Sequence, residues 1–483
     1  MSEVDLRSVR EQERRVEAES SVFKKELGLG DLVLTQILFI VGLPWVGVAA
    51  KQGPSHVILW LLAILLFYVP SAVVVIYLNR QMPLEGGLYQ WAKLGFNDLV
   101  GFMVAWNLWL FVILLTSEIG IQLTEYFVYV LGPQGEWLTS SPWFIGVVNI
   151  VVIVALVVMT IIGLSLGKWV HNAGAVVMLL IFASLLILPL LNLAKGTISE
   201  YRPITIEWPA MTVLTFNLLG KMSFGALGGF EYVAIHAGEA RNPARSIGRS
   251  VAIAAPIICV MFVLGTSSVL ALIPQDQIDL IAPIPQIMSA GFGPLGVALT
   301  VVPLVVIGMS VIRFAQASVQ FGANTRLPMV AGWDDLLPNW FTKLHARYKT
   351  PVNSILFVGA ATLFMGMIGL IGVGKQEAFQ LLWNAGGLFY ALTYVVMFAI
   401  PVFGLRKAGL RPPMWLKIAS LSGLIMTLLY VALSIVPIVN VESKLAFALK
   451  ISGLIVITNL IGYIIYKLAG RRAANNSDAA VVS

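Results

Sequence analysis

Long runs of apolar residues alternate with short polar stretches along nearly the whole chain. Each run reaches the roughly 20 residues that a helix needs to cross a bilayer, where only internally hydrogen-bonded backbone is stable. A transmembrane β-barrel would instead show shorter segments in which apolar and polar residues alternate. The pattern therefore predicts an all-α polytopic membrane protein. It predicts twelve transmembrane helices, at about residues 31–51, 55–79, 98–130, 143–164, 170–193, 211–238, 251–273, 294–324, 352–373, 377–404, 414–439 and 445–468.

The composition excludes a soluble protein. Of 483 residues, 58% are hydrophobic and only 11% are charged, whereas about a quarter of the residues of a soluble domain are charged. One cysteine, Cys259, and four scattered histidines provide neither a disulfide within the chain nor the spacing of metal ligands. No metal and no other cofactor is therefore expected.

Lysine and arginine are distributed unevenly between the two sets of predicted loops. They gather in the hydrophilic segment 1–27, after the last span, and in loops of the same side such as 326–350 and 406–417. Cytoplasmic loops carry this excess. We therefore expect a multi-pass protein of the cell (cytoplasmic) membrane with both termini cytosolic. The net charge of +7 follows from this bias, so no nucleic-acid partner is inferred.

Two spans contain residues that a straight helix avoids. The run 40–47 places Pro44 between two glycines, and the run 223–231 has three glycines in five positions. Proline removes a backbone donor and glycine weakens a helix, so both runs predict non-helical backbone at Gly42, Pro44, Gly225 and Gly228. Interrupted spans at corresponding places in two halves of a chain indicate the substrate site of a transporter.

The two breaks fall in the first and the sixth span, which indicates a repeat of five helices. An odd number of spans inverts the second copy relative to the first. The expected units are a tail at 1–27, a first repeat at 28–193, an inverted repeat at 211–404, two additional helices at 414–468, and a cytosolic tail at 470–483.

Freed N–H groups of one half-helix attract a carboxylate, and freed carbonyls of another attract an ammonium group. A site with both suits the zwitterion of an amino acid. Trp45 and Phe224 are the aromatic residues expected to line it.

Four charged residues fall inside predicted spans, namely Glu118, Lys221, Glu231 and Arg313. A charge at the centre of a membrane helix is costly, so each should face protein, water or a partner. Their charges sum to zero, which permits two structural ion pairs. Glu231 directly follows the glycine-rich break, and we expect it to couple substrate movement to protons.

Four motifs resemble those of the amino acid–polyamine–organocation (APC) superfamily of transporters, over about residues 28–470. They are Pro83–Trp91 (Pro-x-x-Gly-Gly-x-Tyr-x-Trp), Gly229–Glu231 (Gly-Phe-Glu), Gly238–Arg245 with its Glu-x-x-Asn-Pro-x-Arg, and Thr325–Pro328. The resemblance implies the LeuT-like fold: twelve helices, a 5+5 inverted repeat, and discontinuous helices 1 and 6.

The resemblance also implies where the substrate binds. Its carboxylate would meet backbone N–H groups of Gly42, Leu43, Pro44, Trp45 and Val46, except that Pro44 has none. Its amine would meet carbonyls around Ser223, Phe224, Gly225 and Leu227. A lysine that replaces sodium in some members of the superfamily is Met178 here.

The same motifs predict a gate on the cytoplasmic side. We expect Glu239 and Arg245 to form a latch below span 6, in contact with the loop at 80–97. Charge-assisted contacts of this kind hold one end of a pathway closed.

The preferred function is secondary active transport of amino acids by alternating access, either coupled to protons or by exchange, with sodium less favoured. A polyamine or organic cation transporter of the same fold is the alternative. A membrane-embedded enzyme is a further alternative, but no nucleophile–base pair or metal-ligand set occurs in the spans. We therefore expect no enzymatic activity.

Overall fold

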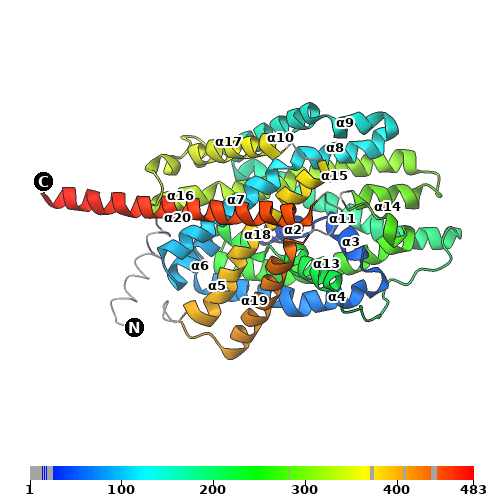
Figure 1. Cartoon of the computed structure of the whole chain (residues 1–483), viewed down its shortest axis with the longest axis horizontal. Coiled ribbons are helices and arrows are strands. Elements are labelled where there is room, and N and C mark those ends of the chain that lie inside the picture. The colour runs from blue at the N-terminus through cyan, green and yellow to red at the C-terminus, as the bar shows by residue number, and fades with distance from the viewer. Residues whose placement is uncertain are drawn as a thin grey trace.

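The apolar runs form helices that mostly lie lengthwise beside one another in a single bundle (Figure 1). The computed structural model describes residues 25–482 except 281, 335, 370–374, 406–409 and 437–442, together with Arg14, Val16 and Ala18. Within these residues there is no β-strand, and one isolated bridge joins Leu27 to Ala240. The predicted all-α class is confirmed.

The first half of the chain supplies α2 (Leu29–Ile40), α3 (Pro44–Ala50), η1 (Gly53–Ser55), α4 (His56–Ala63), η2 (Ile64–Tyr68), α5 (Val69–Gln81), α6 (Leu88–Gly95), α7 (Asp98–Ser117), α8 (Ile119–Leu131), η3 (Gly132–Gly135), α9 (Glu136–Ser140), α10 (Pro142–Ile162) and α11 (Leu164–Lys195).

The second half supplies α12 (Val213–Gly220), η4 (Lys221–Ala226), η5 (Phe230–Glu239), α13 (Pro243–Leu272), η6 (Gln275–Gln277), α14 (Pro283–Phe292), α15 (Ala298–Asn324), α16 (Arg326–Trp333), η7 (Asn339–Thr342), α17 (Val352–Gly369), α18 (Lys375–Ala399), η8 (Ile400–Gly404), α19 (Met414–Ser434) and α20 (Lys444–Val482).

The predicted spans coincide with these helices. Among the described residues, nine helices are long and apolar enough to cross a membrane, and the bent pair of α2 and α3 makes ten. The helix α17 carries a shorter apolar stretch, and the sixth predicted span is divided among α12, η4 and η5. A multi-pass membrane protein follows from this arrangement, while the count of twelve spans stays a prediction.

The first span is broken where the sequence predicts. The helix α2 ends at Ile40, and α3 begins three residues after Val41 with its axis turned by 48°. Pro44 is the first residue of α3. Proline suits this position because its missing N–H would have no partner in the first turn of a helix. The prediction that Pro44 lies in non-helical backbone is therefore wrong, whereas Gly42 does lie between the two helices.

The sixth span is also broken, with a different local geometry. Lys221–Ala226 form a π-helical turn, Gly228 and Gly229 lie outside any helix, and η5 continues as a 3-10 helix. Gly229 has a φ of 141°, and an added Cβ would lie 2.6 Å from the ring of Phe39. Only glycine fits there. Gly228 is non-helical as predicted, but Gly225 lies inside the π-helical turn.

The two broken spans pack directly on each other. The rings of Phe39 and Tyr232 stack with centroids 4.2 Å apart, and the Gln36 side chain donates a hydrogen bond to the Phe230 carbonyl at 3.4 Å. These contacts place both breaks at the same depth in the bundle.

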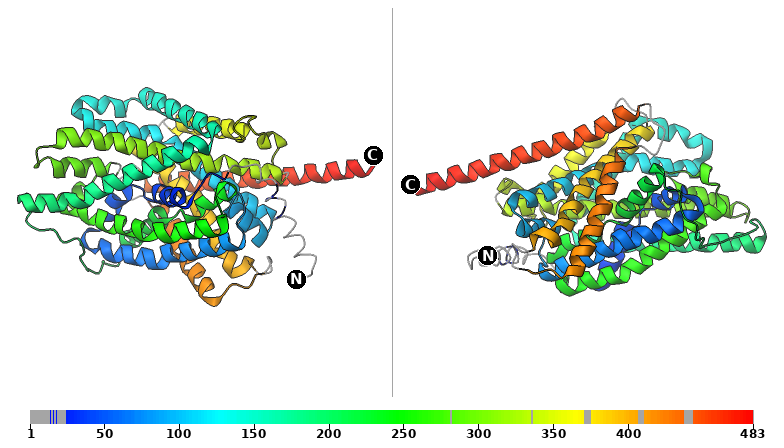
Figure 2. Two further views of the ribbon diagram at one scale, coloured as in Figure 1. Left: turned by 180° about the vertical axis from the view of Figure 1, so that it is seen from behind. Right: turned by 60° about the horizontal axis from the view of Figure 1, so that its bottom comes forward.

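The last helix extends well beyond the bundle. Figures 1 and 2 show α20 projecting past the other helices in every view. The segment 470–482, which the sequence analysis treats as a tail, continues this helix.

Candidate functional site

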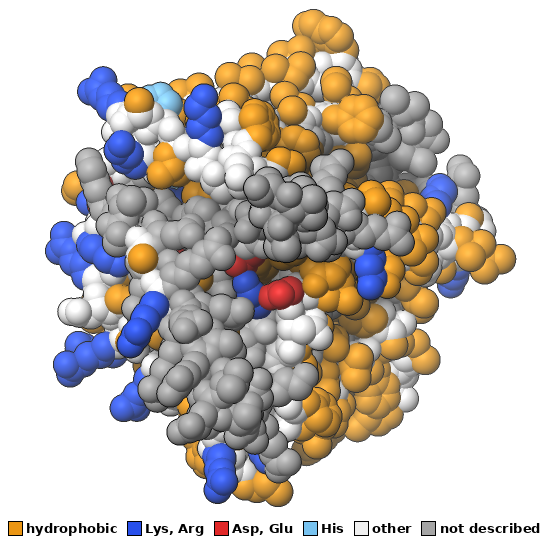
Figure 3. Space-filling view, turned by 90° about the vertical axis from the view of Figure 1, so that its left-hand side faces the viewer, with side chains coloured by type: hydrophobic (Ala, Val, Ile, Leu, Met, Phe, Trp, Pro, Cys, Tyr) orange, Lys and Arg blue, Asp and Glu red, His pale blue; other side chains and the backbone are white. Residues whose placement is uncertain are grey.

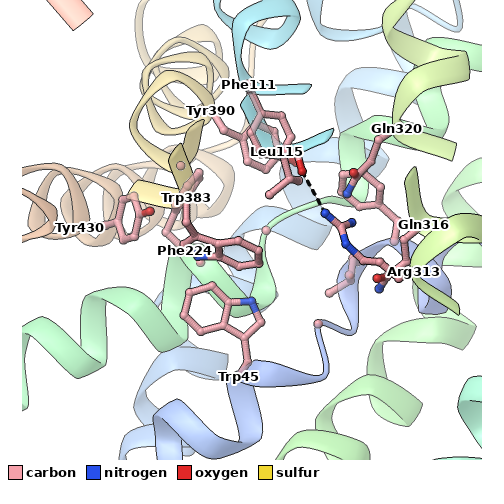
Figure 4. Close-up of a pocket in the computed structure, with 16 residues that line it drawn as sticks. Trp45, Phe111, Leu115, Phe224, Arg313, Gln316, Gln320, Trp383, Tyr390 and Tyr430 are labelled. Atoms are coloured by element: carbon pink, nitrogen blue, oxygen red, sulfur yellow. Dashed lines mark hydrogen bonds between the residues drawn. The ribbon is translucent and has the colours of Figure 1, made fainter. Parts of the chain in front are cut away.

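A cavity of about 90 Å³ lies between the two breaks, and residues of seven helices and of both breaks line it. The lining residues are Phe39, Ile40, Gly42, Trp45, Phe111, Leu115, Phe224, Gly225, Gly228, Arg313, Gln316, Gln320, Trp383, Gly387, Tyr390 and Tyr430. Figure 4 shows that their side chains form two walls, one aromatic and one polar. We call this space the central cavity.

The polar wall belongs to α15, where Arg313, Gln316 and Gln320 follow one another at helical spacing and so share one face. The Gln316 amide donates hydrogen bonds to the carbonyls of Leu38 and Val41, both at 2.9 Å. These carbonyls are at the end of α2, which has no helical partner for them. Gln316 therefore holds the broken end of the first span in place.

Arg313 forms one of the two ion pairs that the sequence allows among the four charged residues, and its partner is Glu118. Its Nη2 atom lies 2.7 Å from Glu118 Oε1 and donates to the Leu115 carbonyl at 2.9 Å. Glu118 is fully buried behind the wall. The guanidinium group of Arg313 therefore lines the cavity, while the Glu118 carboxylate that balances its charge does not.

The aromatic wall is built from α3, η4, α7, α18 and α19. Trp45 faces Trp383 with ring centroids 6.0 Å apart, and Phe224 contacts Tyr390 and Tyr430 at 5.4 Å and 4.7 Å. Gly225 admits the Trp45 ring, since a Cβ at Gly225 would lie 2.5 Å from it. Trp45 and Phe224, the aromatic residues predicted from the sequence to line the site, both line the cavity.

Glu231 is fully buried and does not line the cavity itself. The hydroxyl groups of Tyr390 and Tyr394 each donate a short hydrogen bond to one of its carboxylate oxygens. Tyr394 also accepts a hydrogen bond of 2.6 Å from the Gly229 N–H, next to the break. Because Tyr390 does line the cavity, one hydroxyl group separates Glu231 from it.

The predicted second ion pair does not form within the described part of the chain. Lys221 Nζ donates to Asn384 Oδ1 at 3.3 Å and lies 6.0 Å from the centre of the Tyr430 ring. Glu231 instead receives its hydrogen bonds from the two tyrosines. Lys221 belongs to η4, before the break, and Glu231 to η5, after it, so the break separates their surroundings.

Of the predicted substrate-binding residues, Gly42, Trp45, Phe224 and Gly225 line the cavity. Leu43, Pro44, Val46, Ser223 and Leu227 do not line it, so a side-chain role there is not supported. Val46 packs elsewhere, with its methyl group near Gly265 of α13. Gln316 and Gln320 are cavity residues that the sequence analysis missed. Their polar stripe beside Arg313 in an apolar span is the signal that could have revealed them.

A second polar cluster lies at the end of the bundle formed by α6, α16 and the end of η5. Arg326 Nη2 contacts both oxygens of Glu239, at 2.5 and 2.6 Å, and His236 Nδ1 lies 3.0 Å from Glu239. Glu85 accepts a hydrogen bond of 2.6 Å from the Gly238 N–H and lies 3.4 Å from Arg326 Nε. We call Glu85, His236, Glu239 and Arg326 the gate cluster.

In the gate cluster one predicted contact of Glu239 is wrong, and the predicted contact with the loop at 80–97 is present. Arg245 is exposed on α13, and Arg326 takes the place predicted for it beside Glu239. The expected contact with the loop at 80–97 exists through Glu85. Burial first, and then the neighbouring Glu239 carboxylate, raise the pKa of Glu85 from 4.5 to about 8. The cluster thus holds two carboxyl groups around one guanidinium group, and this crowding favours the protonated form of Glu85.

Comparison with known proteins identifies the family. The model of the family described as amino acid permease matches residues 27–458. An uncharacterized transporter of Legionella pneumophila is 23% identical, over 78% of this chain and 81% of that protein. The branched-chain amino acid permease BcaP of Bacillus subtilis is 23% identical, over 74% and 79%. A probable agmatine/putrescine antiporter of Lactococcus lactis, AguD, is 21% identical, over 86% and 87%.

Among solved structures, MhsT in complex with L-phenylalanine superposes with a TM-score of 0.56 at 13% identity, over 85% of this chain and 98% of that one. This likeness shows the LeuT-like fold predicted from the sequence. The family and its relatives indicate a transporter rather than an enzyme. The chain belongs to the amino acid permease family of the APC superfamily.

Proposed function

We propose that the protein is a secondary active transporter of amino acids across the cytoplasmic membrane, working by alternating access as a proton symporter or an exchanger. The observation that carries this proposal is the central cavity between two broken helices, with an aromatic and a polar wall. Broken helices expose backbone groups at mid-membrane depth, where a zwitterion needs partners for both of its charges.

In this proposal the substrate carboxylate binds near Gly42 and Leu43. The backbone N–H of Trp45 already donates a hydrogen bond to the Gly42 carbonyl at 3.1 Å, and Pro44 has no backbone N–H. This leaves the backbone N–H groups of Gly42, Leu43 and Val46 to face the carboxylate. The amine binds toward the carbonyls of η4, and the aromatic wall packs against the side chain.

A polyamine is the weaker candidate. Multiple ammonium groups need several carboxylates, yet no Asp or Glu is among the described residues that line the cavity, whereas Arg313 is. The only observation in its favour is the relative from Lactococcus lactis whose name refers to agmatine and putrescine.

We further propose Glu231 as the proton-coupling group. Tyr390 connects it to the cavity and Tyr394 connects it to Gly229 at the break. Movement of either half of the sixth span would change these two hydrogen bonds. Protonation of Glu231 and substrate binding would then influence each other.

The gate cluster is proposed to close one end of the pathway. It joins the loop after the second span, the sixth span and α16 through buried charge-assisted contacts, which are stronger than neutral hydrogen bonds. The excess of Lys and Arg in the tails and loops of this end favours its placement on the cytoplasmic side, with both termini.

Uptake by the purified protein in liposomes tests the proposal. Radiolabelled neutral, cationic and acidic amino acids and putrescine are presented with an imposed proton gradient, with a sodium gradient, or with unlabelled substrate inside. We expect saturable uptake of at least one neutral amino acid that responds to the proton gradient or to internal substrate. Uptake of putrescine alone, or of nothing in the panel, would refute the proposal.

A further inference from the structure

A second cavity, of about 160 Å³, lies between α7, α16, α17 and α20 and shares no lining residue with the central cavity. Every lining residue among the described part of the chain is apolar. They are Phe102, Ala105, Trp106, Trp109, Leu327, Pro328, Ala331, Leu337, Phe341, Phe357 and Ile465. We call this space the α7/α16 pocket.

The pocket adjoins the surface that faces lipid. Phe357 lines the pocket and is also 40% exposed on the outside of α17, and Ile464, next to the lining residue Ile465, is exposed on α20. Both helices carry apolar stretches suited to the membrane. The surroundings of the pocket are therefore hydrocarbon on one side and the end of the bundle on the other.

Two exposed basic residues lie close in sequence to lining residues of the pocket. Lys343 follows the lining residue Phe341 by two positions, Lys467 follows Ile465 by two, and both are exposed. Figure 3 shows lysine and arginine side chains along one side of this end of the bundle. Two acids of neighbouring elements, Asp98 and Asp334, already pair with Lys93 at 3.6 and 2.6 Å.

We propose that the α7/α16 pocket binds an acyl chain of an anionic phospholipid from the leaflet at this end, with Lys343 and Lys467 near the headgroup. An apolar cavity of about 150 Å³ in another protein stays dry and takes up benzene, so this one accommodates several methylene groups. Clusters of basic residues beside a membrane surface attract anionic lipids over zwitterionic ones. The site goes beyond the proposed transport of amino acids.

The lipid would act on the gate cluster, because one short helix belongs to both sites. The helix α16 begins at Arg326, which binds Glu239, and its residues Leu327, Pro328 and Ala331 line the pocket. An acyl chain in the pocket would pack against α16 in the position in which Arg326 contacts Glu239. A ligand that binds one conformation better shifts the population toward it. Anionic lipid should therefore favour the closed gate.

The test uses the full chain in nanodiscs of phosphatidylcholine that contain phosphatidylglycerol with a photoreactive diazirine in one acyl chain. Peptides that become cross-linked are identified by mass spectrometry. We expect cross-links to the peptides around Phe102, Trp106 and Phe341. Unlabelled phosphatidylglycerol should compete at least several-fold better than added phosphatidylcholine.

Two variants probe the two parts of the site. Ala331→Trp fills the pocket and should remove these cross-links. Lys343→Glu with Lys467→Glu should abolish the preference for phosphatidylglycerol. Arg249→Glu with Arg411→Glu changes the same net charge at exposed positions elsewhere and should retain the preference.

The map of the unaltered protein decides the question even if Ala331→Trp does not fold. Absence of cross-links from all lining peptides would overturn the proposed pocket. Equal competition by phosphatidylcholine, or loss of the preference in both double variants, would overturn the role of the anionic headgroup.

Discussion

The gate cluster gives a prediction whose size follows from its contacts. Glu239→Gln replaces the carboxylate that Arg326 contacts at 2.5 and 2.6 Å with a neutral amide. A hydrogen bond to a charged group contributes about 1.5–3 kcal/mol. Loss of a buried ion pair often costs more, but Arg326 keeps Glu85 at 3.4 Å. Since 1.4 kcal/mol changes an equilibrium tenfold, the open population should rise about 10- to 100-fold.

Cysteine accessibility measures this change directly. The chain has one native cysteine, so Cys259→Ala provides a background in which a reporter is placed at Thr160. Thr160 lines a small cavity of about 20 Å³ beside His236 and Arg326. Its rate of modification by a water-soluble thiol reagent should rise about 10- to 100-fold in Glu239→Gln, and Arg326→Gln should act in the same direction.

The control is Arg249→Gln, at an exposed position on α13, which should leave the rate unchanged. An unchanged rate in both Glu239→Gln and Arg326→Gln would refute the role of the gate cluster. A raised rate in Arg245→Gln, without a rise in Arg326→Gln, would instead support the pairing first predicted from the sequence.

Three further predictions concern protonation and packing. Because the pKa of Glu85 is raised from 4.5 to about 8, the stability of the closed gate should fall as pH rises between these values. Glu85→Gln should remove this pH dependence from the modification rate of the reporter cysteine. A pH dependence that persists in Glu85→Gln would contradict the prediction. Glu231→Gln should bind substrate yet lose pH-dependent uptake, while Glu125→Gln on α8 should retain it; normal pH dependence in Glu231→Gln would assign that residue to the scaffold. Gly225→Ala places a Cβ 2.5 Å from Trp45 and should lower uptake at least about tenfold. In the control Gly146→Ala the added Cβ meets no atom within 4 Å, so uptake should be unchanged. Equal uptake by the two variants would show that this contact does not hold Trp45 in place.

The helices and the positions of both breaks could be predicted because their causes are local. Apolar length fixes a membrane helix, and the run around Pro44 ends one helix and begins the next. Local sequence is a weaker guide to the geometry of the second break. Gly225 lies inside a π-helical turn and packs against the ring of Trp45, a residue far away in the chain.

The partners of the charged residues could not be predicted for the same reason. Arg326 lies 87 residues from Glu239, and Tyr394 lies 163 residues from Glu231. Arg245 lies close to Glu239 in sequence, and only the packing of the helices shows that Arg326 is the partner instead. The residues that line the cavity from α15 are different, because the spacing of Gln316 and Gln320 after Arg313 is visible in the sequence.

The central claim is that an amino acid binds between the two broken helices. A cryo-electron microscopy structure with the amino acid that gives the highest uptake tests it most directly. We predict density for one molecule in the central cavity, between Trp45 and Phe224 on one side and Arg313 on the other. An empty central cavity with the amino acid bound elsewhere in the bundle would contradict the claim.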